Sequence, residues 1–237
     1  FKQKTAYEIP KRDWSSDVCS SDLQTVEAKA NSGPRNVSVF SQRAFDLMTS
    51  PDAKKAFDLA AEPEKLRDDY GRNTLGQSCL FARRLVESGV RCVTIDHSNW
   101  DTHDGNFNTL KGALLPKLDA AMSTLFRDLS DRGMLDSTLV IITGEFGRTP
   151  KINKNAGRDH WGPCFTVLMG GGGVQGGRVI GASDKWAAQP AHTPYGPEDM
   201  AATLYHLLGL DPLDEMHTPE GRPIMIANNG RVMKELL

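Results

Sequence analysis

Apolar residues at helical spacing dominate the pattern of the chain. Apolar side chains three and four positions apart are typical of amphipathic helices, and a glycine directly after them is typical of a helix C-terminus. The pattern predicts helices over about residues 37–60, 75–86, 116–132 and 197–208, with a restart at Ser50-Pro51-Asp52 inside the first. A charged connector from Glu62 to Arg72 separates the first helical region from the second. The last three helices are followed by Gly89, Gly133 and Gly209.

Short apolar runs stand between these helices. They cover Val90–Ile95, Leu139–Thr143 and Phe165–Met169, and their length is that of buried strands. Because apolar strands alternate with amphipathic helices, we predict an α/β fold with a largely parallel sheet. In such sheets, ligands bind beyond the carboxyl ends of the strands.

Acidic residues and histidines follow two of the predicted strands. Asp101 and His103 come after the first strand, and Glu145 comes directly after the second, in the run Thr143-Gly-Glu-Phe-Gly-Arg-Thr-Pro150. Asp159 and His160 lie one loop further along the chain. Carboxylates and imidazoles at one rim supply the oxygen and nitrogen donors that divalent metal ions need. The sequence therefore predicts a metal site at this rim.

Each of these motifs also has a structural interpretation. The Asp residues near position 101 can bond the local backbone of a polar loop, and His160 beside Trp161 can be a packed surface residue. Arg148 can clamp an anionic substrate group with its two nitrogens, or it can tie the loop through an ion pair with Glu145. Asp159 can be a metal ligand or can orient a ligand. The sequence leaves these alternatives open.

Composition removes several classes of function. The chain has 28 basic and 30 acidic residues in 237, so its charge does not indicate a nucleic-acid partner. No apolar run reaches the roughly 20 residues that span a bilayer. The glycine-rich run 170–177 lacks the Gly-Lys-Ser/Thr ending of a phosphate-binding P-loop, and no Gly-x-Ser-x-Gly elbow of a serine hydrolase is present.

The N-terminal segment differs from the rest of the chain. Residues 11–23, Lys-Arg-Asp-Trp-Ser-Ser-Asp-Val-Cys-Ser-Ser-Asp-Leu, have no helical or alternating pattern and resemble the translated read-through of a sequencing adapter. We therefore treat residues 1–36 as a non-native or disordered segment and residues 37–237 as the C-terminal part of a longer α/β domain.

Four segments together resemble the domain-of-unknown-function family 1501. They are Trp100–His103, Gly144–Pro150, Gly157–His160 and Ser78–Glu87, and the similarity runs from about Val37 to the C-terminus. That family is similar to sulfatases and lies in the alkaline-phosphatase superfamily. The resemblance implies a sulfatase-like three-layer sandwich with a largely parallel sheet, truncated at its N-terminus.

The resemblance also implies roles for the candidate residues. Superfamily members bind two metal ions through an Asp and a His after one strand, an Asp-His pair after the next strand, and a later His. Asp101 and His103 match the first pair at a shorter spacing, Glu145 matches the next Asp, and His160 matches the late His. Phe146 stands where the His of the second pair would be, and a phenyl ring cannot bind a metal ion. Arg148 and Asp159 are then the expected catalytic residues.

The implied function is metal-dependent hydrolysis of phosphate or sulfate esters, with zinc, manganese or calcium as the divalent metal ion. The substrate would be an anionic ester or a sulfated or phosphorylated glycan, and the full-length protein would be periplasmic or exported. Because the superfamily's nucleophile comes from an N-terminal region, we expect this fragment to be inactive alone. The alternative is a non-catalytic sulfatase-like module that binds anionic glycans or cell-surface components.

Overall fold

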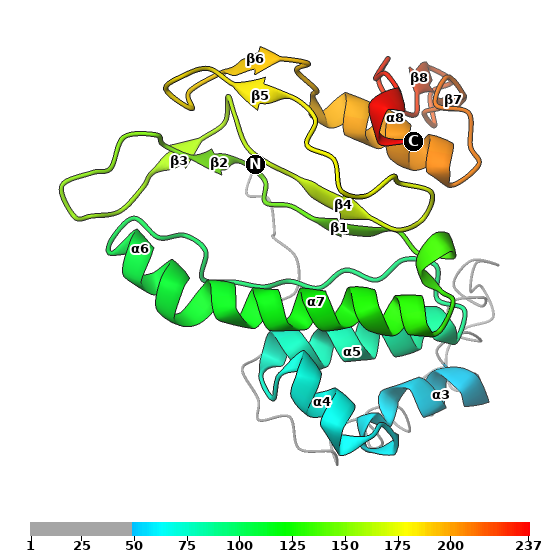
Figure 1. The fold of residues 1–237 in the computed structure, drawn as a ribbon. Coiled ribbons are helices and arrows are strands. Elements are labelled where there is room, and N and C mark those ends of the chain that lie inside the picture. The colour runs from blue at the N-terminus through cyan, green and yellow to red at the C-terminus, as the bar shows by residue number, and fades with distance from the viewer. Residues whose placement is uncertain (1–48) are drawn as a thin grey trace. The chain divides into compact units, whose positions relative to one another are not determined.

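A computed structural model describes residues 49–237 of the chain, and these residues divide into two compact units, 49–95 and 96–237. Figure 1 shows their helices and strands. The segment expected to be non-native or disordered, residues 1–36, and the predicted helical turns before residue 49 lie outside the described residues.

The described part of the first unit is helical. It consists of α3 (Pro51–Phe57), a short 3₁₀ turn η1 (Leu59–Ala61), α4 (Glu64–Tyr70) and α5 (Thr74–Glu87). The side chain of Asn73 accepts a hydrogen bond from the amide of Gly76 and so caps the first turn of α5. The predictions of a helix restart near Pro51 and of a helix over about 75–86 are confirmed.

The predicted connector between Glu62 and Arg72 is wrong, because α4 occupies most of it. Two features favour a helix there. The side chains of Lys65 and Asp69, four positions apart, form an ion pair, and the side chain of Tyr70 is fully buried. The high density of charge therefore marks the solvent face of a short helix, and the single aromatic residue anchors its other face.

The stretch between α5 and the next helix contains no helix or strand, and the boundary between the two units, after Ile95, lies within it. The predicted strand at Val90–Ile95 is absent: none of its residues is fully buried, and none joins a described ladder. An extended segment becomes a strand only when a neighbouring segment accepts its backbone hydrogen bonds. After it come α6 (Asn106–Thr109), the π-helical turn η2 (Leu110–Leu114) and α7 (Leu115–Asp131), so the predicted helix over about 116–132 is confirmed.

Four pairs of short strands follow. The first pair is β1 (Val140–Ile142) with β4 (Leu168–Gly170), in which Ile141 lies opposite Met169. The second is β2 (Gly147–Arg148) with β3 (His160–Trp161), the third β5 (Ala182–Ser183) with β6 (Pro190–His192), and the last β7 (Glu215–His217) with β8 (Pro223–Met225). All of these described pairs are antiparallel. They contain no parallel ladder, and the largely parallel three-layer sandwich stays a prediction.

The β1–β4 pair lies along α7 in the second unit (Figure 1). A Cβ atom added to Gly170 of β4 would stand 2.7 Å from the ring of Phe126, so this glycine lets the strand approach the helix closely. The predicted strands at Leu139–Thr143 and Phe165–Met169 correspond to β1 and, shifted towards the C-terminus, β4.

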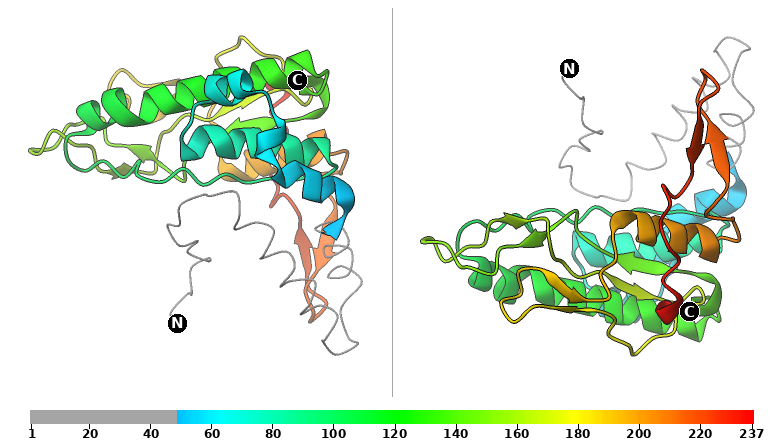
Figure 2. Two further views of the ribbon diagram at one scale, coloured as in Figure 1. Left: turned by 90° about the horizontal axis from the view of Figure 1, so that it is seen from below. Right: turned by 90° about the horizontal axis from the view of Figure 1, so that it is seen from above.

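The C-terminal part contains α8 (Pro197–Leu207), which confirms the fourth predicted helix, and the 3₁₀ turn η4 (Lys234–Leu236). Asp199 of α8 is buried and bonds both the backbone amide and the guanidinium of Arg231, which fastens the C-terminal segment to this helix. Figure 2 shows the β7–β8 hairpin extending away from the β1–β4 pair.

Candidate metal centre

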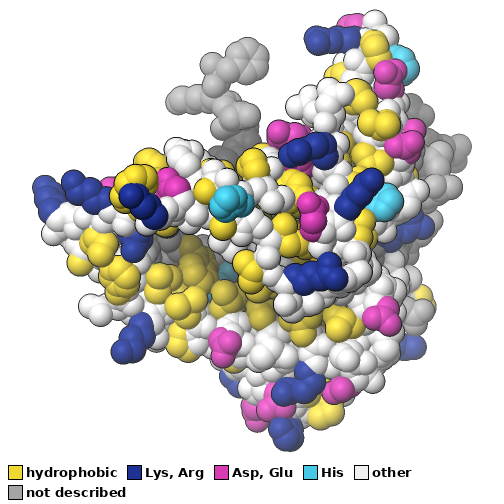
Figure 3. All heavy atoms as spheres, turned by 45° about the horizontal axis from the view of Figure 1, so that its top comes forward, with side chains coloured by type: hydrophobic (Ala, Val, Ile, Leu, Met, Phe, Trp, Pro, Cys, Tyr) yellow, Lys and Arg dark blue, Asp and Glu magenta, His cyan; other side chains and the backbone are white. Residues whose placement is uncertain are grey.

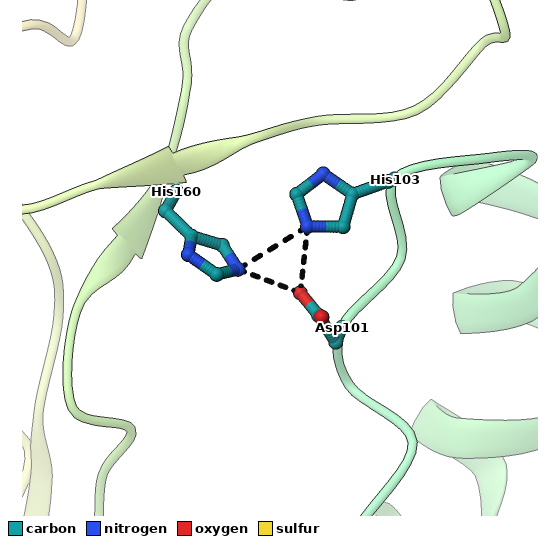
Figure 4. A group of neighbouring side chains, drawn as sticks. All are labelled: Asp101, His103 and His160. Atoms are coloured by element: carbon teal, nitrogen blue, oxygen red, sulfur yellow. Dashed lines mark hydrogen bonds and ion pairs between the residues drawn. The ribbon is translucent and has the colours of Figure 1, made fainter.

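Three of the predicted ligands meet at one point of the second unit. The Oδ1 atom of Asp101 lies 3.0 Å from Nε2 of His103 and 2.8 Å from Nε2 of His160, and the two Nε2 atoms are 3.2 Å apart. Figure 4 shows the three side chains converging from a loop and from strand β3. The structure thus brings together residues that are up to 59 positions apart in the sequence.

The β2–β3 hairpin carries His160 to this point. In its register Arg148 lies opposite His160. The loop of the hairpin is bound to the segment before α6, because the amides of Gly105 and Asn106 donate to the carbonyls of Asn155 and Ala156. These backbone bonds hold the segment with Asp101 and His103 against the hairpin, and they do not depend on the candidate ligands themselves.

Asn153 is a supporting residue that the sequence did not single out. Its side-chain amide nitrogen donates to the carbonyl of His103 (2.9 Å) and to Oδ1 of Asp159 (3.2 Å). Its Oδ1 atom accepts bonds from the amides of Asn155 and Gly157. The sequence signal was the run Asn153-Lys-Asn-Ala-Gly157, since an Asn at the start of a turn commonly bonds the backbone two or more residues ahead.

Gly157 permits the close contact between the hairpin loop and His103. It is buried, and a Cβ atom added to it would stand 1.7 Å from the carbonyl oxygen of His103. No side chain fits at such a distance, so any other residue at this position must move one of the two segments.

Asp159 bonds His103 rather than joining the three donors. Its Oδ1 atom lies 2.7 Å from Nδ1 of His103, on the side of the ring opposite to the nitrogen that faces Asp101. The contact raises the pKa of His103 above its ordinary value, and the bonds from His103 and Asn153 lower the pKa of Asp159. Of the alternatives that the sequence left open, the geometry favours an orienting role for Asp159.

Arg148 is engaged within the protein. Its guanidinium donates to Oδ1 of Asp101 (2.8 Å) and to the carbonyl oxygens of Trp100 and Arg158. The bonds from His160 and Arg148 together lower the pKa of Asp101 to about 2. Asp101 is thus a carboxylate at neutral pH, the form in which it can bind a metal ion. Arg148 ties the loop as in the structural interpretation of the sequence, but its partner is Asp101 instead of Glu145.

A family comparison agrees with the motifs that surround this cluster. The model of the family described as "Protein of unknown function (DUF1501)" matches residues 11–237. The chain belongs to the DUF1501 family. No curated protein and no solved structure matches it. The family match begins at residue 11, upstream of the boundary near Val37, and so includes the segment interpreted as an adapter; that interpretation stays a prediction.

Glu145 and Phe146 of this DUF1501 protein do not join the three donors. Glu145 is exposed and belongs to no group of potential ligand atoms among the described residues. The ring of Phe146 packs on the ring of His160, with the centroids 4.3 Å apart. The aromatic residue at the position expected for a second histidine therefore supports the side chain of a candidate ligand.

The three donors of the DUF1501 cluster lie slightly closer together than the ligand atoms of a bound zinc ion. Tetrahedral zinc with bonds of about 2.0–2.1 Å places its ligand atoms about 3.3 Å apart. The observed separations of 2.8–3.2 Å are close to this value, and the side chains of Asp101 and His160 are 63% and 50% exposed. The cluster can therefore hold one ion through three protein atoms and leave a coordination position open to solvent.

None of the helices in the described part of this DUF1501 protein combines the length and the apolar character needed to cross a membrane.

Proposed function

We propose that this DUF1501 protein is a metal-dependent hydrolase of phosphate or sulfate esters. The observation that carries the proposal is the convergence of Asp101, His103 and His160, whose donor atoms lie within 3.2 Å of one another. Three protein ligands with an open position are typical of catalytic metal sites, whereas structural zinc sites use four.

The donor set favours zinc among the three ions considered. Two imidazole nitrogens and one carboxylate oxygen suit zinc and its neighbours in the transition series. Calcium prefers six to eight oxygen ligands, and manganese binds a given set of nitrogen and oxygen donors more weakly than zinc does, so both suit this set less well. A bound zinc ion would supply a Lewis acid that polarises an oxygen of the ester.

The residues of the chain would prepare the site for this ion. Asp159 keeps the proton of His103 on Nδ1, which leaves the lone pair of Nε2 for the metal. Arg148 holds the carboxylate of Asp101 in place, and Phe146 holds the ring of His160. Each of the three ligands thus has its own support, which lowers the cost of ordering the side chains when the ion binds.

Hydrolysis by the complete gene product tests this proposal. We would measure release of p-nitrophenol from p-nitrophenyl phosphate and p-nitrophenyl sulfate, with added zinc and with a chelator. The proposal expects turnover that needs the metal and that falls at least about 100-fold in His160→Ala. Turnover that is unaffected by chelation and by His160→Ala would contradict it.

One observation favours a second candidate function. Phe146 occupies the position of a metal ligand in the superfamily pattern and packs on His160, so residues 49–237 offer donors for one ion instead of two. A sulfatase-like module that binds anionic glycans without cleaving them would tolerate this change. It predicts glycan binding and no release of p-nitrophenol from either ester.

A further inference from the structure

A hollow lies beside the metal cluster, in the loop between β2 and β3. Its volume is about 490 Å³. The residues around it come from one stretch of eleven positions and include two lysines. They are Thr149, Lys151, Ile152, Asn153, Lys154 and Asp159.

The two lysines differ from the arginines of the same hairpin. Arg148 bonds Asp101 and two carbonyls, and Arg158 bonds the carbonyls of Thr149 and Pro150 while its guanidinium lies over the ring of Phe107. Lys151 and Lys154 are exposed, and neither ammonium forms a hydrogen bond or an ion pair with any residue between 49 and 237. Both charges are therefore available to a ligand.

Positive charge gathers at this end of the second unit. Figure 3 shows Lys and Arg side chains, in dark blue, clustered where the β2–β3 loop projects. The lining of the hollow has one acidic residue, Asp159, against two lysines, so it keeps a net positive charge. The hollow as a whole is suited to an anion.

Asp159 also fixes where the hollow lies relative to the metal donors. It borders the hollow and contacts Nδ1 of His103, whereas Nε2 of the same ring points to Asp101 and His160. The imidazole ring of His103 thus separates the hollow from the donors. An anion held by the lysines is a neighbour of the reacting group and not the reacting group itself.

We propose that Lys151 and Lys154 bind a second anionic group of the substrate, so that the preferred substrates are small molecules, such as sulfated or phosphorylated oligosaccharides, that carry at least two acidic groups. This inference rests on the proposed hydrolase function and assigns its specificity. Each ammonium group acts as a point charge that attracts a sulfate or phosphate group. Such recognition tolerates variation in the rest of the substrate.

The residues of the hollow favour a small polyanion over a nucleic acid. Proteins that bind single-stranded nucleic acids combine basic grooves with aromatic side chains on which bases stack. None of the six residues that line the hollow is aromatic.

Binding of sucrose octasulfate to the complete chain tests the proposal without relying on turnover. We would titrate the wild type, the Lys151→Gln/Lys154→Gln variant and a control Lys185→Gln/Lys234→Gln variant by calorimetry, in chelator and again with zinc. All four lysines are exposed, and each double substitution removes two positive charges. We expect the first variant to lose about tenfold or more in affinity in both conditions, and the control to stay within about twofold of the wild type.

The outcomes separate this proposal from the proposed hydrolase function. Equal losses in the two variants, no loss in the Lys151→Gln/Lys154→Gln variant, or no binding by the wild type would overturn the lysine subsite. So would tighter binding of a single-stranded oligonucleotide than of the sulfated sugar. Selective loss in the first variant supports the subsite even if the protein hydrolyses no ester, in which case the hydrolase function alone fails.

Discussion

The Nδ1 atom of His103 lies 2.7 Å from Oδ1 of Asp159, and this contact decides which ring nitrogen faces Asp101. A histidine ligand usually donates its second ring N–H to a carboxylate or carbonyl, which fixes its tautomer and orientation. Here the acceptor comes from the β2–β3 loop, the same loop that ends in His160. The orientation of one candidate ligand is therefore linked to the position of another.

Removal of this carboxylate is predicted to weaken metal binding without removing a ligand. Loss of such a partner typically costs 10–100-fold in metal affinity. We expect Asp159→Ala to weaken zinc binding by about that factor in a competition titration with a chromophoric chelator. Asp104→Ala is the matched control, because Asp104 is exposed and its side chain bonds no described residue. Equal affinities of Asp159→Ala and the wild type would contradict the orienting role.

Gly157→Ala is predicted to disrupt the site by steric contact alone. The added Cβ atom would lie 1.7 Å from the carbonyl oxygen of His103, so the loop and His103 must separate. We expect the variant to lose more than about tenfold in zinc affinity and to melt at a lower temperature. In the control Gly162→Ala, the new methyl group meets no described atom within 4 Å, and both quantities should stay near those of the wild type. A Gly157→Ala variant with unchanged zinc affinity would show that the site does not need this close contact.

The first unit contains a buried ion pair whose loss should be costly. Glu62 bonds both Arg83 and Arg84, and its side chain is 6% exposed, whereas that of Glu64 is 75% exposed in its pairs with Arg67 and Arg72. Breaking a buried pair by removing one partner costs about 3–5 kcal/mol, and an exposed pair contributes at most about 1 kcal/mol. Because Arg83 keeps its bond to Glu87, we expect Glu62→Gln to lower the free energy of unfolding by about 3 kcal/mol.

Urea denaturation of Glu62→Gln and Glu64→Gln measures this difference. Glu64→Gln should change the free energy of unfolding by less than about 1 kcal/mol. Similar values for the two variants would contradict the role given to the buried pair.

The same pair predicts how stability depends on pH. Burial by itself raises the pKa of Glu62, but the bonds and charges of Arg83 and Arg84 outweigh it and hold the pKa below the ordinary 4.5. A folded-state pKa below the unfolded one contributes stability above pH 4.5, and this stability is lost as the pH falls through the folded-state value. The stability difference between the wild type and Glu62→Gln should therefore shrink as the pH falls from 6 towards and below 4 (about the titration range of a glutamate). A difference that stays constant or grows on acidification would contradict this assignment.

The sequence predicted the helices better than the strands, for a physical reason. The apolar stripes that mark α5, α7 and α8 are properties of each segment alone, and glycines follow all three. A strand depends on a partner elsewhere in the chain, so Val90–Ile95 has the composition of a strand without a described ladder. Helix α4 was missed because its charges hid a single buried anchor, Tyr70.

The candidate site was predictable in part. Spacing after the predicted strands identified Asp101, His103 and His160, which the structure brings together. It did not separate them from Glu145, which belongs to no group of potential ligand atoms among the described residues, because the direction of a side chain after a strand depends on the turn that follows. The supports also required coordinates: Asn153 acts through four bonds in a loop, and Phe146 acts through its ring contact with His160.

Zinc content of the purified chain tests the central claim most directly. After incubation with zinc and removal of free metal, we expect about one zinc ion per chain, bound by three protein ligands. His160→Ala and Asp101→Ala should retain far less, whereas His192→Ala, which changes an exposed histidine of β6, should retain as much as the wild type. A wild-type chain without bound zinc, or variants at Asp101 and His160 that retain a full equivalent, would contradict the proposed metal centre.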